Sequence, residues 1–109
     1  IAEIDKAIEK IIRDNAQKFV DFFNLSKSIT IKRHQLELLP GLGKKHMLEI
    51  VKQRELKTFD SFEDLEKRIH LMPNPVHILA KRIVEELEGK EDKHFLFVRP
   101  PSKKPFDFE

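Results

Sequence analysis

Apolar residues along this chain recur at steps of three and four positions, a spacing that places them on one face of an α-helix. The pattern is longest over residues 2–24, which include Ile4 and Ile8 near the start and Phe22 and Phe23 at the end. It returns over residues 31–39, 44–54, 61–69 and 76–88. The spacing therefore predicts an all-α fold in which a long first helix is followed by shorter ones.

Residues with strong capping preferences separate the predicted helices. We expect Ser28 or Thr30 to cap the second helix, because a Ser or Thr hydroxyl accepts a hydrogen bond from the first free backbone NH groups. Ser61, with Asp64 three residues later, resembles a capping box. Gly89 follows the last helical pattern, where a glycine commonly ends a helix.

Residues 93–98, "KHFLFV", show a strand-like pattern, because they are short, aromatic and bounded by charge and proline. A lone strand leaves its backbone groups unsatisfied. We therefore expect this strand to pair with another molecule or with a region that this chain lacks. Residues 99–109 hold three of the six prolines, so we expect an extended or disordered tail.

The chain also contains an internal repeat with an offset of 33 residues. This offset aligns "QLELLPGLGKKHMLEI" with "RIHLMPNPVHILAKRI", so that Leu36 meets Ile69 and Pro40 meets Pro73. Each unit predicts a helix, a tight turn and a second helix. Short helix pairs of this kind need a neighbour to complete their core, and chance similarity between two amphipathic pairs is the alternative.

The first turn, Leu39-Pro40-Gly41-Leu42-Gly43, resembles the helix-hairpin-helix motif of nucleic-acid-binding proteins. The second turn, over residues 72–76, resembles a degenerate copy that keeps the proline and lacks both glycines. The resemblance implies a tandem helix-hairpin-helix domain over residues 26–90. An amphipathic helix over residues 1–25 is expected before it, and the strand and tail of residues 91–109 after it.

A second resemblance covers nearly the whole chain. The blocks "QLELLPGLGKKHMLEI", "SFEDL", "PVHILAKRIVEEL" and "FLFV" are similar to a family of uncharacterised archaeal proteins that are described as RNA-binding. In that family, an oligonucleotide-binding type of barrel precedes the helical part. The chain begins with Ile1 and not with Met, so we expect a fragment without this N-terminal barrel, and we expect the barrel to contact the C-terminal strand.

A Gly-x-Gly turn places no Cβ in the way of a ligand and directs backbone NH groups outward at the start of the next helix. Those NH groups and the helix dipole suit a phosphate. The motif resemblance implies that the phosphate lies against the amides of Leu42, Gly43, Lys44 and Lys45. The full set of expected nucleic-acid-binding residues is Gly41, Leu42, Gly43, Lys44, Lys45, Lys32, Arg33 and Arg54.

The charge distribution favours the same partner. Residues 26–57 carry 8 basic and 3 acidic side chains, a net charge of +5, whereas the whole chain carries +2. Contacts between cations and a nucleic-acid backbone tolerate any base sequence and weaken as salt increases. The sequence therefore predicts a nucleic-acid-binding module, with RNA favoured over DNA only through the family resemblance. Ribonucleoprotein or translation association is compatible with the basic block.

A protein-interaction or dimerisation module is the alternative function, and DNA is the alternative nucleic acid. The amphipathic first helix and the unpaired strand support the first of these, because both need a partner. Phe95 and Phe97 alternate along the strand, and we expect them to pack into a core rather than to stack on bases.

Several classes of function lack the residues that they need. The chain has no Cys, its five His lack a coordinating spacing, and adjacent acidic pairs such as Glu63 and Asp64 diverge on a helix. We therefore expect a non-enzymatic protein without a metal, cofactor or small-molecule substrate. The apolar runs, such as "FLFV", are far too short to cross a bilayer, so we expect a cytoplasmic protein without a membrane partner.

Overall fold

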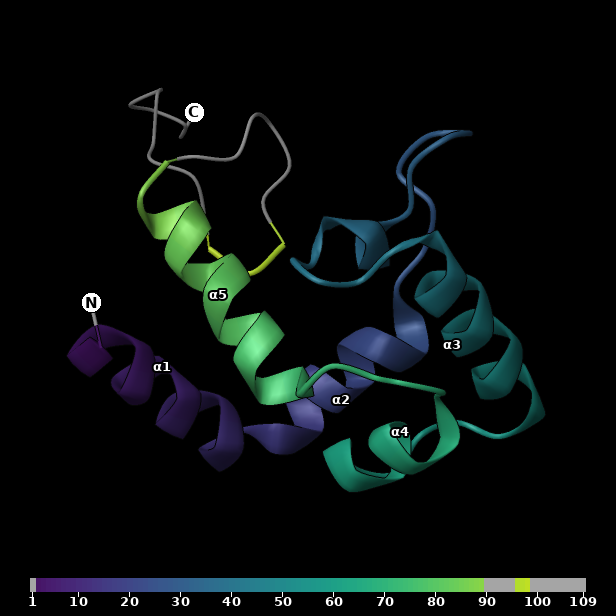
Figure 1. Cartoon of the computed structure of the whole chain (residues 1–109), viewed down its shortest axis with the longest axis horizontal. Helices are drawn as coiled ribbons and strands as arrows, with labels where there is room; N and C mark the ends of the chain where they lie inside the picture. The colour runs from purple at the N-terminus through teal and green to yellow at the C-terminus, as the bar shows by residue number, and fades with distance from the viewer. Residues whose placement is uncertain (1, 90–95, 99–109) are drawn as a thin grey trace, which may run out of the picture.

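The computed structural model describes residues 2–89 and 96–98 and is all-α over that part of the chain. Its elements are α1 (Ala2–Asp14), α2 (Ala16–Leu25), the 3₁₀ helix η1 (Gln35–Leu38), α3 (Lys44–Leu56), α4 (Phe62–Arg68) and α5 (Pro75–Leu87), as Figure 1 shows. The described residues form no sheet, only one isolated bridge between Ser28 and His34. The all-α prediction is confirmed.

The first helix differs from the prediction, because two helices replace the single helix expected over residues 2–24. The break lies at Asn15, whose backbone angles of φ −123° and ψ 39° leave the helical region. The Asn15 side-chain amide donates to the Ile11 carbonyl at 2.8 Å. An Asn side chain that bonds to nearby backbone competes with helix propagation, which is why a continuous apolar stripe did not give a continuous helix.

The second predicted helix is also shorter than expected. Residues 27–34 form a loop, and only Gln35–Leu38 is helical. The Thr30 hydroxyl accepts from the NH groups of Lys32 at 3.2 Å and Arg33 at 3.1 Å, which holds the chain in a turn. The cap of η1 is therefore neither Ser28 nor Thr30 but His34, whose Nδ1 accepts from the Leu36 NH at 3.1 Å.

The three later helices are confirmed, and so are the cap at Ser61 and the glycine stop at Gly89, but the capping box expected at Ser61 and Asp64 is only half formed. The Ser61 hydroxyl accepts from the Asp64 NH at 3.0 Å, as a cap of α4 should. The Asp64 carboxylate accepts from the Asp60 NH, not from Ser61. Gly89 follows α5 with a φ of +72°, a left-handed conformation that glycine adopts without strain.

One hydrophobic core joins all of these helices. It contains Ile12 from α1, Phe23 from α2, Ile50 from α3, Leu65 from α4 and Leu79 from α5, each almost fully buried. Helix α1 packs mainly against α5, so the first and last helices of the chain lie side by side (Figure 1). On α1, Ile8 and Ile12 are buried in this core, whereas Ile4 and Ile11 stay exposed.

The predicted strand is not formed by the residues of it that the structure describes. The backbone NH groups of Leu96, Phe97 and Val98 all donate to the Glu86 carboxylate, at 2.8, 3.0 and 2.9 Å. Arg82 Nε donates to the same carboxylate at 2.8 Å, so this buried charge is paired. A side chain therefore satisfies the backbone groups for which we expected a neighbouring strand. Residues 93–95, the tail of residues 99–109 and any contact with a barrel lie outside the described residues.

Phe97 packs into the core, as the sequence predicted. Its ring lies 5.6 Å from the Phe19 ring and 5.0 Å from the Phe22 ring, measured between centroids. Phe95 lies outside the described residues.

The chain contains two successive pairs of helices joined by a turn, η1 with α3 and α4 with α5. Their structural register differs from the predicted offset of 33 residues. The left-handed residue of the first turn is Gly41, with φ +88°, and that of the second is Leu71, with φ +55°, an offset of 30. Gly43 caps α3 and Asn74 caps α5, an offset of 31. The two prolines that aligned in sequence therefore do not occupy equivalent places.

Side chains of α3 hold the second turn against the first unit. His46 Nε2 lies 3.1 Å from the Leu71 carbonyl oxygen, and Glu49 Oε2 accepts from the His70 NH at 3.1 Å. Because His46 and Glu49 are three residues apart, they share one face of α3. The two turns are consequently fixed relative to each other.

Candidate nucleic-acid interface

The two glycines of the first turn have different structural roles. Gly41 has a left-handed backbone, which residues with a Cβ adopt only with strain. Gly43 has an extended backbone, with φ −96°, and a Cβ added there would meet nothing within 4 Å. The backbone thus favours a glycine at position 41. At position 43, the glycine leaves the N-terminus of α3 uncovered by a side chain.

The backbone amides of the turn are not equally available to a ligand. The Leu42 NH donates to the Leu39 carbonyl at 3.1 Å and the Leu42 side chain is buried, so this residue departs from the expected role of a ligand. The Gly43 NH makes only a long hydrogen bond of 3.5 Å to His46 Nδ1. Lys44 and Lys45 are the first residues of α3, so their NH groups have no acceptor within the helix.

The side chains of Lys44 and Lys45 are both exposed beside these amides. Lys44 Nζ lies 3.6 Å from Glu37 Oε2, and the Glu37 carboxylate also accepts from the His34 NH at 2.8 Å. The hydrogen bond from His34, helped by the charge of Lys44, lowers the pKa of Glu37. Glu37 is therefore ionised at neutral pH and holds Lys44 above the first turn.

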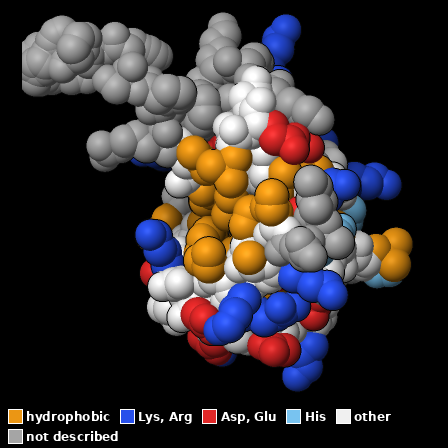
Figure 2. Space-filling view, turned by 90° about the vertical axis from the view of Figure 1, so that its left-hand side faces the viewer, with side chains coloured by type: hydrophobic (Ala, Val, Ile, Leu, Met, Phe, Trp, Pro, Cys, Tyr) orange, Lys and Arg blue, Asp and Glu red, His pale blue; other side chains and the backbone are white. Residues whose placement is uncertain are grey.

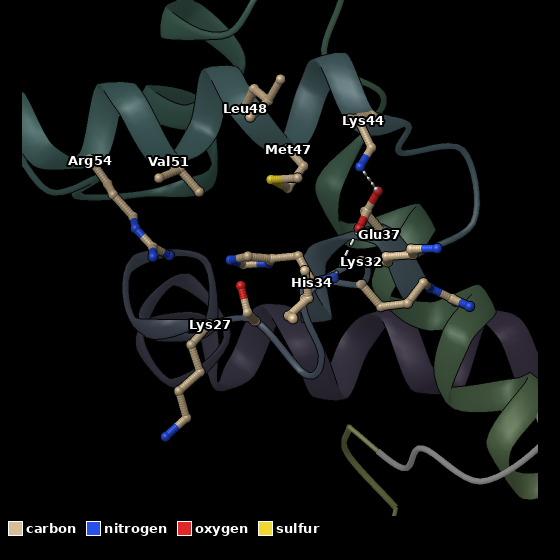
Figure 3. Close-up of a pocket in the computed structure, with 12 residues that line it drawn as sticks. Lys27, Lys32, His34, Glu37, Lys44, Met47, Leu48, Val51 and Arg54 are labelled. Atoms are coloured by element: carbon tan, nitrogen blue, oxygen red, sulfur yellow. Dashed lines mark hydrogen bonds and ion pairs between the residues drawn. The ribbon is translucent and has the colours of Figure 1, made fainter.

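A groove of about 430 Å³ opens beside this turn, between α3 and the loop of residues 27–34 (Figure 3). The α3 wall consists of Lys44, Met47, Leu48, Val51 and Arg54. These positions are three or four residues apart, so they form one face of the helix. Lys44 belongs both to the turn and to the groove, which makes the two features continuous.

The loop wall brings together two of the cations predicted from the sequence. Lys32 and Arg33 are exposed and line the groove with Lys27, so they lie on the same side of the molecule as Lys44. Lys45 is exposed on the first turn of α3 but does not line the groove. The predicted basic surface is thus divided between the turn and the groove.

The Arg54 side chain is hydrogen-bonded within the fold. Its guanidinium donates to the Phe23 carbonyl at 3.0 Å, to the Ser26 hydroxyl at 3.1 Å and to the Ser26 carbonyl at 2.7 Å. These acceptors lie at the end of α2, where helix carbonyls lack intrahelical partners. Burial lowers the pKa of Arg54, which nevertheless stays cationic at neutral pH. Arg54 thus lines the groove mainly as a structural cap, unlike the other predicted cations.

His34 and the aliphatic side chains were missed by the sequence reasoning. His34 is buried in the loop wall and its Nδ1 accepts from the Leu36 NH, so the neutral ring carries its proton on Nε2. Burial, and then the charge of Arg54, lowers the pKa of His34. Figure 3 shows Met47 and Val51 extending from α3 toward the His34 ring. Ile31, an apolar residue in a polar loop, was the one sequence signal of this groove.

The described residues lack the features of two other classes of site. No three His, Asp or Glu side chains in that part of the chain come together in a way that could hold a metal ion. None of its helices combines the length and apolarity needed to cross a membrane.

The fold and groove define a small all-α domain with a basic face. The model of the family described as "Protein of unknown function (DUF655)" matches residues 1–99, and the chain belongs to that family.

Two archaeal proteins illustrate the relationship. "Uncharacterized protein MJ0038" of Methanocaldococcus jannaschii is 44% identical over 99 residues, which cover 90% of this chain and 45% of that protein. The crystal structure of Af1531 from Archaeoglobus fulgidus superposes with a TM-score of 0.81 at 43% identity, over 88% of this chain and 53% of that one. The chain therefore spans about half the length of these relatives.

Proposed function

We propose that this chain is a non-enzymatic nucleic-acid-binding module of the helix-hairpin-helix type, which binds the phosphate backbone at the start of α3. The observation that carries the proposal is the uncovered N-terminus of α3 at Gly43. The helix begins there with exposed backbone, empty space in place of a Cβ, and two exposed lysines on its first turn.

Elementary electrostatics supports an anion at this place. Free NH groups and the positive end of the helix dipole attract phosphate. Lys45 adds a positive charge beside them, and Lys44 adds a second cation whose charge is partly balanced by Glu37. Lys32 and Arg33 extend the positive surface along the groove. Because all of these groups bind phosphate and not base edges, binding is expected to tolerate any sequence and to weaken steeply with salt.

RNA is the proposed natural partner, through the family resemblance of the sequence. The first measurement is therefore a titration of an RNA hairpin and a DNA hairpin of the same sequence at several salt concentrations. Tighter binding of the RNA supports the proposal in full, whereas equal binding supports the backbone contact and excludes a preference for RNA.

The decisive variant is Gly43→Val, which places a branched side chain beside the amides at a position where the new Cβ meets nothing within 4 Å. We expect a loss of affinity of about ten- to a hundredfold, because hydrogen bonds to charged groups contribute roughly 1.5–3 kcal/mol each. The matched control is Asn74→Val at the equivalent cap of α5, where an Asn side-chain cap is lost but binding should not change. Equal effects of the two variants, or no binding at low salt, would refute the proposal.

A second candidate function, dimerisation or protein interaction, is favoured by one surface. Figure 2 shows apolar side chains gathered on the side of the molecule that carries α1 and α5. Ile4 and Ile11 of α1 and Leu87 of α5 are exposed large apolar residues. Light scattering over a range of concentrations, with Ile11→Glu as the disrupting variant, tests this candidate. A monomer at every concentration excludes the dimer.

A further inference from the structure

The groove beside the first turn has an apolar floor between basic rims. Met47 is buried and Val51 is half-buried on its α3 wall, and both face the loop wall (Figure 3). The exposed cations stand around this floor, Lys44 on one wall and Lys32 and Arg33 on the other. A ligand that fits both parts must combine an anion with an apolar face.

Two large aliphatic side chains at the groove are left in water. Ile31, in the loop, has a relative exposure of 102%, and Leu48, on α3, has 59%. Burying apolar surface is favourable, so a ligand that covers these side chains gains affinity from them. A ligand held only by the lysines gains nothing from these side chains.

The charges select an anionic ligand. Four exposed cations line the groove, namely Lys27, Lys32, Arg33 and Lys44. The one carboxylate of the lining, Glu37, is already engaged by Lys44 and by the His34 NH. The field in the groove is therefore positive, and it is continuous with the phosphate site proposed at Gly43 through Lys44.

We propose that this groove binds an unpaired nucleotide of a single strand, with its base against the aliphatic residues and its phosphates on the basic rims. This inference rests on the proposed function, because the strand would continue from the amides at Gly43. The base of a duplex is stacked and paired inside the helix and cannot reach the floor. The groove thereby makes the module prefer single-stranded over double-stranded RNA.

An unpaired base offers two flat faces that aliphatic and aromatic side chains can cover without reading its sequence. The lining contains aliphatic groups, so it accepts any base and adds apolar contact, not base-edge hydrogen bonds. An acidic peptide with apolar side chains is the competing occupant. The continuity between groove and turn favours the nucleotide, since one backbone can satisfy both.

The test uses Ile31→Ser combined with Leu48→Ser, which removes aliphatic surface and leaves every charge in place. Both side chains are exposed, so the fold should be retained. The matched control is Leu56→Ser, an exposed leucine on α3 that does not line the groove. The probes are an oligouridine single strand and an RNA duplex of equal length, titrated at low salt.

We expect the double variant to bind the single strand about five- to tenfold more weakly, at the lower end of the effect of losing a stacked contact. Duplex binding should change less than twofold, the salt dependence should be unchanged, and Leu56→Ser should behave as the unaltered protein. Unchanged affinity for the single strand, or equal losses on both probes, would overturn the inference.

Gly43→Val separates this inference from the proposed function. If Gly43→Val weakens both probes while the groove variant weakens neither, the groove inference fails and the phosphate site stands. If neither variant changes binding, both fail. Finally, a peptide of alternating Glu and Leu that displaces oligouridine from the unaltered protein, but much less well from the groove variant, would assign the groove to a protein partner instead.

Discussion

The two turns share a backbone shape but present different chemistry. Gly41 and Leu71 are both left-handed, and a 13-residue helix follows each turn. At the start of α3, the cap is a glycine with open space in front. At the start of α5, the Asn74 side chain accepts from the His77 NH at 3.1 Å, and Pro75 has no NH to offer.

Within this repeat, the backbone shape of a turn and the chemistry at the start of the following helix vary independently. The second turn keeps its shape without glycine because His46 and Glu49 of α3 bond to its backbone. Its helix start is satisfied internally, so little remains for a ligand. The first turn adopts its shape through Gly41, and the NH groups at the start of α3 remain available to a ligand.

The strongest predicted difference between the two helix starts is in RNA binding. Lys44→Ala combined with Lys45→Ala should weaken RNA binding at low salt by at least tenfold. It should also lower the slope of log affinity against log salt by about 1.5, because each lost phosphate contact removes roughly 0.7–0.9. Lys81→Ala, an exposed lysine on α5, is the control and should change neither quantity. If the three lysines prove equivalent, the two helix starts do not differ in function.

The next effect is on stability, at the left-handed residue of the first turn. Gly41→Ala should lower the free energy of unfolding by about 1–2 kcal/mol, the penalty for a left-handed residue with a Cβ. Strain is the main cause, because the new Cβ would lie 3.7 Å from Ile78 Cγ2, an ordinary contact. Urea unfolding of Gly41→Ala and Gly43→Ala measures the difference. Equal losses would mean that the left-handed backbone is not what requires glycine.

The opposite change in the second turn should stabilise the protein. Leu71→Gly removes the left-handed strain from a side chain that is 79% exposed, so little burial is lost. The greater freedom of glycine in the unfolded chain offsets part of this gain. A net stabilisation of about 0.5–1 kcal/mol is expected in the same urea experiment. A destabilised variant would show that the Leu71 side chain stabilises the fold by more than the strain of its left-handed backbone costs.

The smallest effect is a dependence on pH that is specific to the first unit. Its first helix is capped by His34, whereas α4 is capped by Ser61, which does not titrate. The pKa of His34 is lowered by burial, so the unfolded state binds more protons below about pH 6.5 and stability falls as the pH drops through that value.

His34→Asn tests this dependence because Asn also caps a helix but does not titrate. Thermal unfolding between pH 7 and pH 5 should show a smaller loss for this variant than for the unaltered protein. Identical pH profiles would exclude His34 as the cause. Glu37 and Asp64, whose pKa values are lowered, keep their charges until the pH falls further and affect both proteins alike.

Local sequence signals predicted the later helices and their ends well. The cap at Ser61, the glycine after α5 and the turn before α3 all depend on contacts within a few residues, so they can be deduced from spacing alone. The same reasoning failed at Asn15 and Thr30, where a polar side chain bonded to the backbone and outweighed the apolar spacing. It also placed the repeat in the wrong register. The sequence alignment matched Pro40 with Pro73, whereas the left-handed residues of the two turns, Gly41 and Leu71, are 30 residues apart.

The sequence by itself determined the all-α class, the glycine turn and the concentration of positive charge over residues 26–57. Only the tertiary structure decided which charged side chains are exposed to a ligand and which are held by contacts within the fold. It assigned Arg54 to the end of α2, Glu86 to the amides of residues 96–98, and the loop of residues 27–34 to a groove against α3. The physical reason is distance along the chain. Helical spacing and turns are encoded by neighbours, whereas these contacts join residues that only the packed core brings together.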